Sequence, residues 1–199
     1  PSTGPVTARL RRPTIPIEIW DNSASMRVSA KADYAARAAA ELSTATEKPM
    51  KADRNADAQD IPAKFLETIL LELKHAGIVR SQRGPDGGYT LARPAEDISV
   101  ADVIRAVDGP LANVRGDRPE NIEYNGAAEP LTDVWIAVRA ALRDILETTT
   151  LAHLRDRQLP PRVAELTDDP EAWVSLGRIR GATPTGGRKN QPKASSARS

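Results

Sequence analysis

The side chains best suited to recognition chemistry lie between residues 64 and 88. They are Lys64, Glu67 and Thr68 on a predicted helix, followed by Arg80, Ser81, Gln82, Arg83, Gly84, Gly87 and Gly88 around a predicted turn. A glutamate can accept a hydrogen bond from the amino group of cytosine, and an arginine can enter a narrow minor groove. Closely spaced glycines let backbone amides approach phosphate groups. This set of residues therefore predicts contacts with DNA.

Lys64, Glu67 and Thr68 can contact DNA only if their helix leaves them outside the core. An apolar stripe at helical spacing, which we expect to be buried, consists of Phe65, Leu66, Ile69, Leu70 and Leu73. Pro62 suits the first turn of this helix, and Gly77 follows its last periodic residue as a C-terminal cap. Lys64, Glu67 and Thr68 fall outside the stripe, where they can meet water or base edges.

The arginines and glycines belong to a predicted hairpin after that helix. Residues 78–82 alternate weakly as a strand, residues 84–88 must turn, and residues 89–91 return. The glycine run matches neither the nucleotide P-loop nor the dinucleotide-binding spacing, and taken alone it indicates only a turn. The order of helix, glycine stop, strand, arginine and glycine tip indicates a winged helix. Such a domain presents one helix to the major groove and a hairpin to the neighbouring backbone or minor groove.

Two further helices are predicted before this helix and hairpin, and one after them. The first runs from Ser29, as N-cap, to about residue 45, with an inner face of Tyr34, Ala35, Ala38 and Leu42, and a weaker helix covers residues 51–59. After the hairpin, Ser99 and Asp102 form a capping box for a short helix that ends at residues 108–110. The predicted fold class is mainly α with a small β-hairpin wing, a winged helix-turn-helix followed by a long C-terminal helix.

The long helix is predicted to begin at residue 131 and to cover about twenty residues. Its apolar positions, at spacings of three and four, are Leu131, Val134, Trp135, Val138, Leu142 and Ile145. A stripe of this length exceeds what one small winged domain needs. It predicts either a helix that pairs with a second copy of the chain or a core helix within one chain. Residues 148–154 are expected to form a short helix after it.

Four motifs in series carry a family resemblance. They are residues 26–38, residues 61–67, residues 76–94 and residues 98–110. In this order they resemble the IscR/NsrR/CymR family of bacterial regulators, also called the Rrf-two family, over about residues 26–154. The resemblance implies a homodimeric transcription factor, here expected to be a repressor, that binds a palindromic double-stranded DNA operator and pairs through its long helix. Among the family's roles in iron-sulfur assembly, nitrosative stress, and cysteine and sulfur metabolism, the last fits a cysteine-free member best.

The absence of cysteine is the main departure from that family. Many members hold an iron-sulfur cluster with three cysteines in the segment that matches residues 111–130, and this chain has no cysteine at all. His75 and His153 cannot replace thiolate ligands, so we expect no cofactor and no metal. A small-molecule effector or a partner protein is expected instead, with a plain solvated loop as the alternative. The candidate contact residues in this segment are Arg115, Arg118, Glu123 and Tyr124.

A second departure is the pair Arg54-Asn55, where the family has an apolar residue followed by alanine. It predicts that the supporting helix is rotated, shorter or more loosely packed. Net charge is only +1 over 199 residues, so DNA affinity must come from local clusters such as Lys64, Arg80 and Arg83.

Composition and motifs also limit the class of protein. No segment approaches the run of about 20 apolar residues that spans a bilayer, and the start lacks the pattern of a secretory signal. We therefore expect a cytoplasmic protein with no membrane partner. Nucleophile elbows, zinc-ligand histidine pairs and phosphate-binding loops are missing from the sequence, so we expect no enzyme.

The chain divides into four predicted parts. These are an extended arm (1–25), a winged helix-turn-helix DNA-binding domain (26–93), a dimerisation and effector region (94–154) and a C-terminal extension (155–199). The extension is expected to hold an added helix near residues 171–178 and a disordered basic tail from about residue 178. Two other functions stay open. One is a constitutive winged helix without an effector, and the other is a protein-interaction or RNA- or ribosome-associated factor.

Overall fold

The computed structural model describes residues 28–45 and 48–174. The predicted N-terminal arm and basic tail lie outside these residues. The chain separates into two compact units, one ending at Pro160 and the other beginning at Pro161. Within the described ranges, no helix is both long and apolar enough to cross a membrane.

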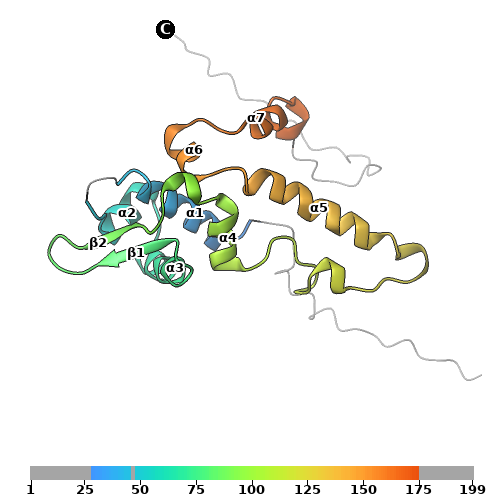
Figure 1. The fold of residues 1–199 in the computed structure, drawn as a ribbon, viewed down its shortest axis with the longest axis horizontal. Coiled ribbons are helices and arrows are strands. Elements are labelled where there is room, and N and C mark those ends of the chain that lie inside the picture. The colour runs from blue at the N-terminus through green and yellow to red at the C-terminus, as the bar shows by residue number, and fades with distance from the viewer. Residues whose placement is uncertain (1–27, 46–47, 175–199) are drawn as a thin grey trace, which may run out of the picture. The chain divides into compact units, whose positions relative to one another are not determined.

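Helix α1 (Ala30–Leu42) is the centre of the first unit, and α3 and α4 pack against it (Figure 1). It begins where predicted, because the Ser29 hydroxyl accepts a hydrogen bond from the backbone N–H of Ala32. Its inner face is built largely from fully buried alanines, namely Ala32, Ala35, Ala38 and Ala39. Small side chains let the neighbouring helices approach closely, so α1 serves as the shared packing surface of the domain.

Helix α2 (Ala52–Gln59) and helix α3 (Ala63–His75) form the predicted helix-turn-helix. The turn depends on Asp60, whose left-handed backbone (φ 49°) ends α2, and on Ile61, which is buried and donates its N–H to the Ala56 carbonyl at 3.0 Å. The departure at Arg54-Asn55 is accommodated by polar contact. Asn55 is buried and its amide donates to the Ala38 carbonyl of α1 at 3.1 Å, while Arg54 faces solvent.

The buried side of α3 agrees with the predicted stripe except at its rim. Leu66, Ile69, Leu70 and Leu73 are fully buried, but Phe65 is 56% exposed. The prediction that Phe65 belongs to the core is therefore wrong. Phe65 lies at the edge of the stripe, where the ring of Tyr34 in α1 meets it edge to face, with 6.3 Å between the ring centroids.

The wing is an antiparallel hairpin of β1 (Val79–Gln82) and β2 (Gly88–Leu91), as predicted. Its register pairs Val79 with Leu91 and Gln82 with Gly88. Met50, just before α2, adds a bridge to the outer side of β2 through two hydrogen bonds with Tyr89 of 2.8 and 2.9 Å. Gly88 permits this close approach, because a Cβ there would lie 2.4 Å from the Met50 carbonyl oxygen. The base of the wing is thus fixed to the start of α2.

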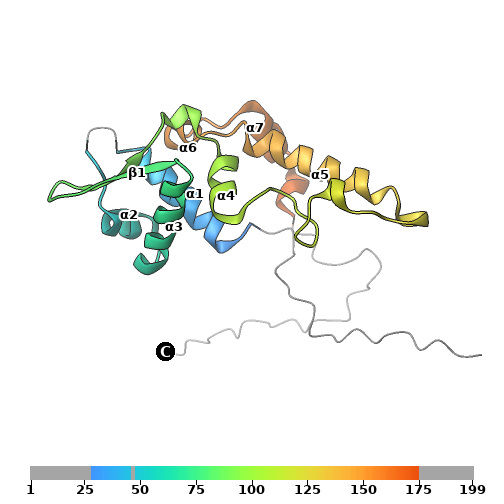
Figure 2. The same cartoon turned by 60° about the horizontal axis from the view of Figure 1, so that its bottom comes forward.

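Helix α4 (Val100–Asp108) follows a short 3-10 turn, η3 (Ala95–Asp97), and opens with the predicted capping box of Ser99 and Asp102. Two more 3-10 turns, η4 (Pro119–Asn121) and η5 (Gly126–Ala128), lie in the connection to helix α5 (Leu131–Leu146). Helix α5 has 16 residues, fewer than expected, and no residue of it is buried. It contacts the rest of its unit mainly through η4 and α4 (Figures 1 and 2).

After α5 the chain returns to the domain and forms the predicted short helix, α6 (Leu151–Asp156). Backbone hydrogen bonds from Val100 to Thr149 and from Leu151 to Ile98 fix this return at 2.8 and 2.9 Å. His153 closes a capping box with Thr150, so its ring has a local structural role. Both ends of α5 are therefore attached to the domain, while no residue along the helix is buried.

The second unit contains helix α7 (Pro161–Thr167) and the 3-10 turn η6 (Pro170–Trp173). The added helix expected near residues 171–178 lies partly outside the described residues, and the 3-10 turn η6 covers its described start. Helix α7 was not expected from the sequence, although Pro161 suits its first position. The Trp173 indole donates to the Thr167 carbonyl at 2.8 Å and closes the unit on itself.

Candidate nucleic-acid interface

The outer face of α3 carries the three residues predicted to read bases. Lys64, Glu67 and Thr68 are all exposed, and neither Lys64 nor Glu67 forms an ion pair with another described residue. Thr68 makes only a long contact of 3.4 Å with the Lys64 carbonyl. In both ribbon views α3 lies on the opposite side of α1 from α6 (Figures 1 and 2). The three polar groups are available to a ligand.

Other residues of α3 that lie outside the stripe have different surroundings. Glu72 pairs with Lys31 of α1 at 2.7 Å, and the same ammonium donates to the Val107 carbonyl at 2.7 Å. This contact ties α1, α3 and α4 together, so Glu72 serves packing and not recognition. Leu71 is half exposed and adds an apolar group to the outer face of α3. Apolar side chains can contact the methyl group of thymine.

The hairpin places the predicted wing residues in the solvent. Arg80, Ser81, Gln82, Arg83 and Gly84 are all exposed. Arg80 donates from Nε to the Thr90 hydroxyl at 3.0 Å across the two strands, which orients its guanidinium along the wing. The tip is a β-turn closed by the Gly87 N–H and the Gly84 carbonyl at 2.9 Å, with Pro85 at its second position. Arg83 precedes this turn directly and extends from a fixed base.

Two of the predicted glycines are needed for the hairpin itself. A Cβ on Gly87 would lie 2.5 Å from the Gln82 carbonyl, and a Cβ on Gly88 would collide with the backbone of Met50. These contacts explain why glycine stands at both positions without any ligand. Contact of Gly87 and Gly88 with DNA stays a prediction.

Lys51 is a basic residue near the wing that the sequence reasoning did not select. It is the exposed N-cap of α2 and follows Met50, whose backbone pairs with Tyr89 in the wing. The chain pairing between Met50 and the wing is a tertiary feature, and the sequence gives no local signal for it. With Lys51 included, the outer face of α3 and the wing have four exposed cations among their candidate contact residues (Lys51, Lys64, Arg80 and Arg83), against the carboxylates of Glu67 and Asp86. The local charge favours a polyanion although the whole chain is nearly neutral.

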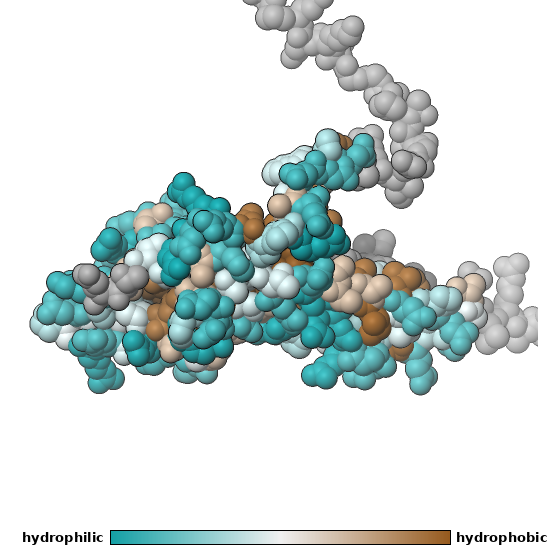
Figure 3. All heavy atoms as spheres, turned by 45° about the horizontal axis from the view of Figure 1, so that its top comes forward, coloured by the Kyte–Doolittle hydropathy of each residue, from teal (hydrophilic) through white to brown (hydrophobic). Residues whose placement is uncertain are grey.

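The six residues predicted for the dimer interface lie on α5, and none of them is buried. Val134 is 48% exposed and Leu131 37% exposed. Hydrophobic surface gathers along α5 in the space-filling view, bordered by polar atoms (Figure 3). Trp135 has one specific contact, a hydrogen bond of 3.0 Å from its indole to the Tyr124 hydroxyl. The interpretation of α5 as a core helix within one chain finds no support in its burial.

The four candidate effector residues are not brought together. Arg118 lines a cavity of about 500 Å³, whereas Arg115, Glu123 and Tyr124 do not line it. Arg115 has a left-handed backbone (φ 55°) within the tight turn between Val114 and Asp117. The other charged residues of the cavity are Glu120, which lies in the predicted segment, and three arginines that the sequence did not indicate, Arg105, Arg139 and Arg143. They come from three separated segments, so only tertiary structure reveals the group.

No cluster of three or more histidine, cysteine, aspartate or glutamate residues suited to a metal ion occurs in the part of the chain that the structure describes.

Two carboxyl groups that bond to arginines of the cavity have lowered pKa values. A backbone hydrogen bond and the Arg139 guanidinium lower the pKa of Glu120. Hydrogen bonds from Arg105 and Arg143 lower the pKa of Glu147.

Comparison with known proteins gives a consistent result. The family model "Rrf2: Iron-dependent Transcriptional regulator" matches residues 28–157. The protein Rv1287 of Mycobacterium tuberculosis (strain ATCC 25618 / H37Rv), named provisionally as an HTH-type transcriptional regulator, is 51% identical over 151 residues, which cover 75% of this chain and 94% of the relative. The HTH-type transcriptional regulator CymR of Bacillus subtilis is 32% identical over 130 residues, covering 65% of this chain and 89% of CymR.

Two solved structures are similar as well. The structure of CymR, described as the global cysteine regulator of B. subtilis, has a TM-score of 0.57 and 29% identity, and covers 66% of this chain and 97% of that one. IscR of T. potens has a TM-score of 0.52 and 29% identity, and covers 76% of this chain and 93% of that one.

Proposed function

The chain belongs to the Rrf2 family of transcriptional regulators, and we propose that it acts as a homodimeric repressor at a palindromic DNA operator. The observation that carries this proposal is the exposed polar face of α3 beside a basic wing. A DNA-binding regulator of this fold needs such a face for base edges and such a wing for the flanking backbone or minor groove. In this account Lys64, Glu67 and Thr68 enter the major groove.

The wing supplies the second set of contacts in this proposal. Arg83 and Gly84 reach the flanking minor groove or backbone, while Arg80, Ser81 and Gln82 contact sugar and phosphate. Gly87 and Gly88 keep the hairpin tight enough to fit beside the duplex. Phosphate contacts of this kind position the protein, and the α3 contacts supply sequence preference.

The exposure of α5 supports the dimeric part of the proposal. None of its residues is buried, Leu131 and Val134 are exposed, and a second copy of α5 packed in the antiparallel direction would cover its apolar stripe. The interface residues in this account are Leu131, Val134, Trp135, Val138, Leu142 and Ile145. A two-fold axis through the paired helices would present two α3 helices to two inverted half-sites, which is why a palindrome is expected.

An iron-sulfur cluster does not fit this chain, although the matching family model is described as iron-dependent. Such clusters need thiolate ligands in most of their positions, and the sequence has no cysteine. Regulation must therefore use another signal. By analogy with CymR we assign the targets to cysteine and sulfur metabolism, and a role on the chromosome places the protein in the cytoplasm.

Selection from a random duplex library tests the proposal. The full-length protein should enrich an inverted repeat whose half-sites are about one helical turn apart. Repeating the selection with Glu67→Ala should relax one position in each half-site, since removal of an acceptor removes its base preference. Enrichment of a single unrepeated site, or of single-stranded RNA in a parallel selection, would contradict a homodimer that binds an operator.

A further inference from the structure

A basic cavity lies at the junction of α4, η4 and α5. Its volume is about 500 Å³, within the range of sites that bind small metabolites. Four of its lining side chains are arginines, Arg105 from α4, Arg118 from the loop before η4, and Arg139 and Arg143 from α5. Glu120 is the one carboxylate among the lining residues. Cations therefore outnumber carboxylates on the cavity wall.

Three of the arginines are held in place by carboxylates. Arg139 bonds to Glu120 at 2.6 Å, and Arg143 bonds to Glu147 at 2.9 Å. Arg105 bonds to the same Glu147 oxygen and lies 3.9 Å from Asp102. A single carboxylate oxygen thus receives two guanidinium groups. These ion pairs orient the arginines before any ligand arrives, which reduces the entropy cost of binding.

Arg118 differs from the other three arginines. It is exposed, and its guanidinium group makes no hydrogen bond or ion pair with another described residue. Its charge still lowers the pKa of the neighbouring Glu120. A guanidinium group offers five N–H donors in a planar fork that matches carboxylate and phosphate oxygens. Arg118 therefore has its full donor capacity available at the cavity wall.

We propose that this cavity binds a small organic anion carrying at least two carboxylate or phosphate groups, and that this anion is the effector of the regulator. Arg118 and Arg139 supply the principal donors, and Arg105 and Arg143 border the other side. The excess of guanidinium groups over carboxylates in the lining disfavours a cationic ligand. Binding itself does not depend on the function proposed above, whereas the effector role rests on it.

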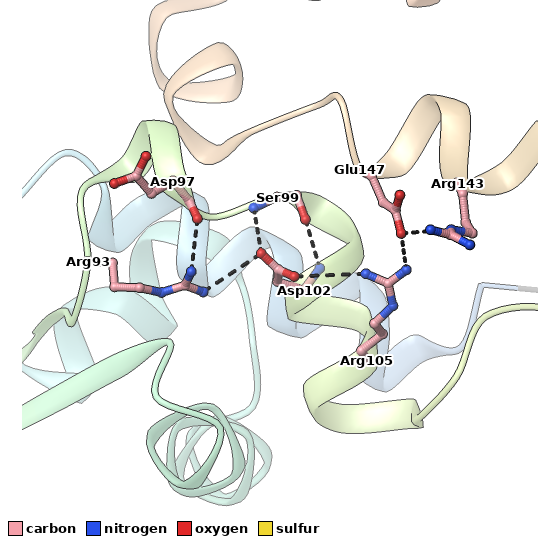
Figure 4. A network of polar contacts seen from close by, with 7 residues as sticks. All are labelled: Arg93, Asp97, Ser99, Asp102, Arg105, Arg143 and Glu147. Atoms are coloured by element: carbon pink, nitrogen blue, oxygen red, sulfur yellow. Dashed lines mark hydrogen bonds and ion pairs between the residues drawn. The ribbon is translucent and has the colours of Figure 1, made fainter.

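The consequence for DNA binding follows from a polar network that Figure 4 shows from close by. Arg93, just after β2, bonds to the Asp97 carbonyl at 3.1 Å and lies 3.7 Å from Asp102, which caps α4. Asp102 in turn lies beside Arg105, and Arg105 and Arg143 meet at Glu147. The network links the end of the wing to α5.

An anion that engages Arg105 or Arg143 competes with Glu147 for their donors. The contact between α4 and α5 then weakens, and the DNA-binding domain gains freedom relative to the dimer helix. An effector acts only through different affinities for the DNA-competent and incompetent states. In this proposal the contact between α4 and α5 is formed in the first state and weakened in the second. Ligand binding is expected to lower operator affinity.

Isothermal titration of the full-length protein without DNA tests the site directly. The probes are citrate and inorganic pyrophosphate, which separate carboxylate from phosphate ligands, and sodium chloride keeps the ionic strength constant. At least one probe should bind saturably at one site per chain. Arg118→Gln should weaken this binding about tenfold or more, since it removes charge-assisted hydrogen bonds without breaking an ion pair.

Arg115→Gln is the matched control, because Arg115 belongs to the same segment and does not line the cavity. It should leave probe affinity within about twofold, since surface substitutions away from a site have small effects. Equal losses in Arg115→Gln and Arg118→Gln, or no saturable binding of either probe, would overturn the site.

Operator anisotropy with and without the probe then tests the effector role. The probe that binds should weaken the operator complex of the wild-type chain and of Arg115→Gln but not that of Arg118→Gln. Binding without any change in operator affinity would overturn the effector role. A weaker operator complex of Arg118→Gln in the absence of probe, with a flatter salt dependence, would make Arg118 a DNA phosphate contact and overturn the site. Failure of the proposed function is a different result, in which probe binding persists but no operator is found.

Discussion

Helices α3 and α5 are both amphipathic, and the domain uses them in opposite ways. Apart from Phe65 at its rim, the apolar stripe of α3 is covered by its own chain, with Leu66, Ile69, Leu70 and Leu73 no more than 1% exposed. The apolar stripe of α5 has no buried residue, and Val134 is 48% exposed. The two helices therefore expose different kinds of surface. Helix α3 offers a polar face suited to base edges, and α5 offers an apolar face suited to a second copy of the chain.

The largest expected effect comes from charging the stripe of α5. Val134→Asp combined with Val138→Asp should convert the dimer to a monomer, because the buried interface would have to hold unpaired carboxylates. Operator affinity should fall by about 100-fold to 10,000-fold as the two half-sites lose their linkage. Sedimentation velocity and anisotropy measure the two results.

Ala140→Asp is the control for this double variant. Ala140 is exposed on α5 and lies outside the stripe, so the new carboxylate should leave the protein dimeric. If the double variant stays dimeric, or if Ala140→Asp dissociates the protein equally, the apolar stripe of α5 is not the dimer interface and the contrast with α3 fails.

The corresponding change in α3 should affect folding and not assembly. Leu70→Ala removes a fully buried side chain and should lower the free energy of unfolding by about 2–5 kcal/mol. Val134→Ala in α5 should lower the unfolding free energy of the monomeric form by less than about 1 kcal/mol, since the side chain is half exposed there. Urea denaturation in a background that is already monomeric would compare the two. Equal losses would mean that α5 belongs to the core.

Substitutions in α3 and in the wing should have different effects on DNA binding. Glu67→Ala should reduce discrimination at one base pair by about 1–3 kcal/mol while changing total affinity less. Arg83→Ala should weaken binding to all sequences and reduce the salt slope by about one unit. Anisotropy titrations over a salt series on the selected operator and its single-base variants would separate the two. Identical behaviour of the two variants would contradict the division of labour between helix and wing.

The smallest expected effect concerns pH and the contact between α4 and α5. Hydrogen bonds from Arg105 and Arg143 lower the pKa of Glu147 in the folded protein. A carboxyl group with a lowered folded pKa stabilises the fold above its ordinary range, and this contribution is lost as the pH falls through the lowered value. Thermal unfolding between neutral and acidic pH should show this loss in the wild type. Glu147→Gln should show a flatter acid dependence. An unchanged acid dependence in Glu147→Gln would show that this ion pair adds no stability.

Periodicity, helix caps and turn residues in the sequence predict most of the helices and the hairpin. The capping residues Ser29 and Ser99 mark where α1 and α4 begin, and the glycine-rich tip marks the hairpin, because caps and turns depend on neighbours in sequence. Phe65 was misjudged since its burial depends on how α1 crosses the rim of α3. Helical spacing identifies a stripe, but it does not say what covers that stripe.

The same limit applies to the candidate sites. The residues expected on α3 and the wing are contiguous or nearly so, and the structure leaves most of them exposed as the pattern suggests. The cavity brings together Arg105, Arg118 and Arg139, which are far apart in sequence, and the bridge from Met50 to Tyr89 brings Lys51 to the wing. Such groupings arise from the packing of α4 and α5 and from strand pairing. Their members are too far apart in sequence to form a local pattern.

The stoichiometry of the operator complex tests whether the regulator binds its operator as a homodimer. Sedimentation equilibrium of the full-length protein, alone and with one duplex carrying the selected site, gives the number of chains in each species. We expect the free protein to have twice the chain mass and the complex to contain two chains on one duplex. A free monomer that binds the same duplex as a single chain would contradict it, because the exposed stripe of α5 would then have no partner in the regulator's working form.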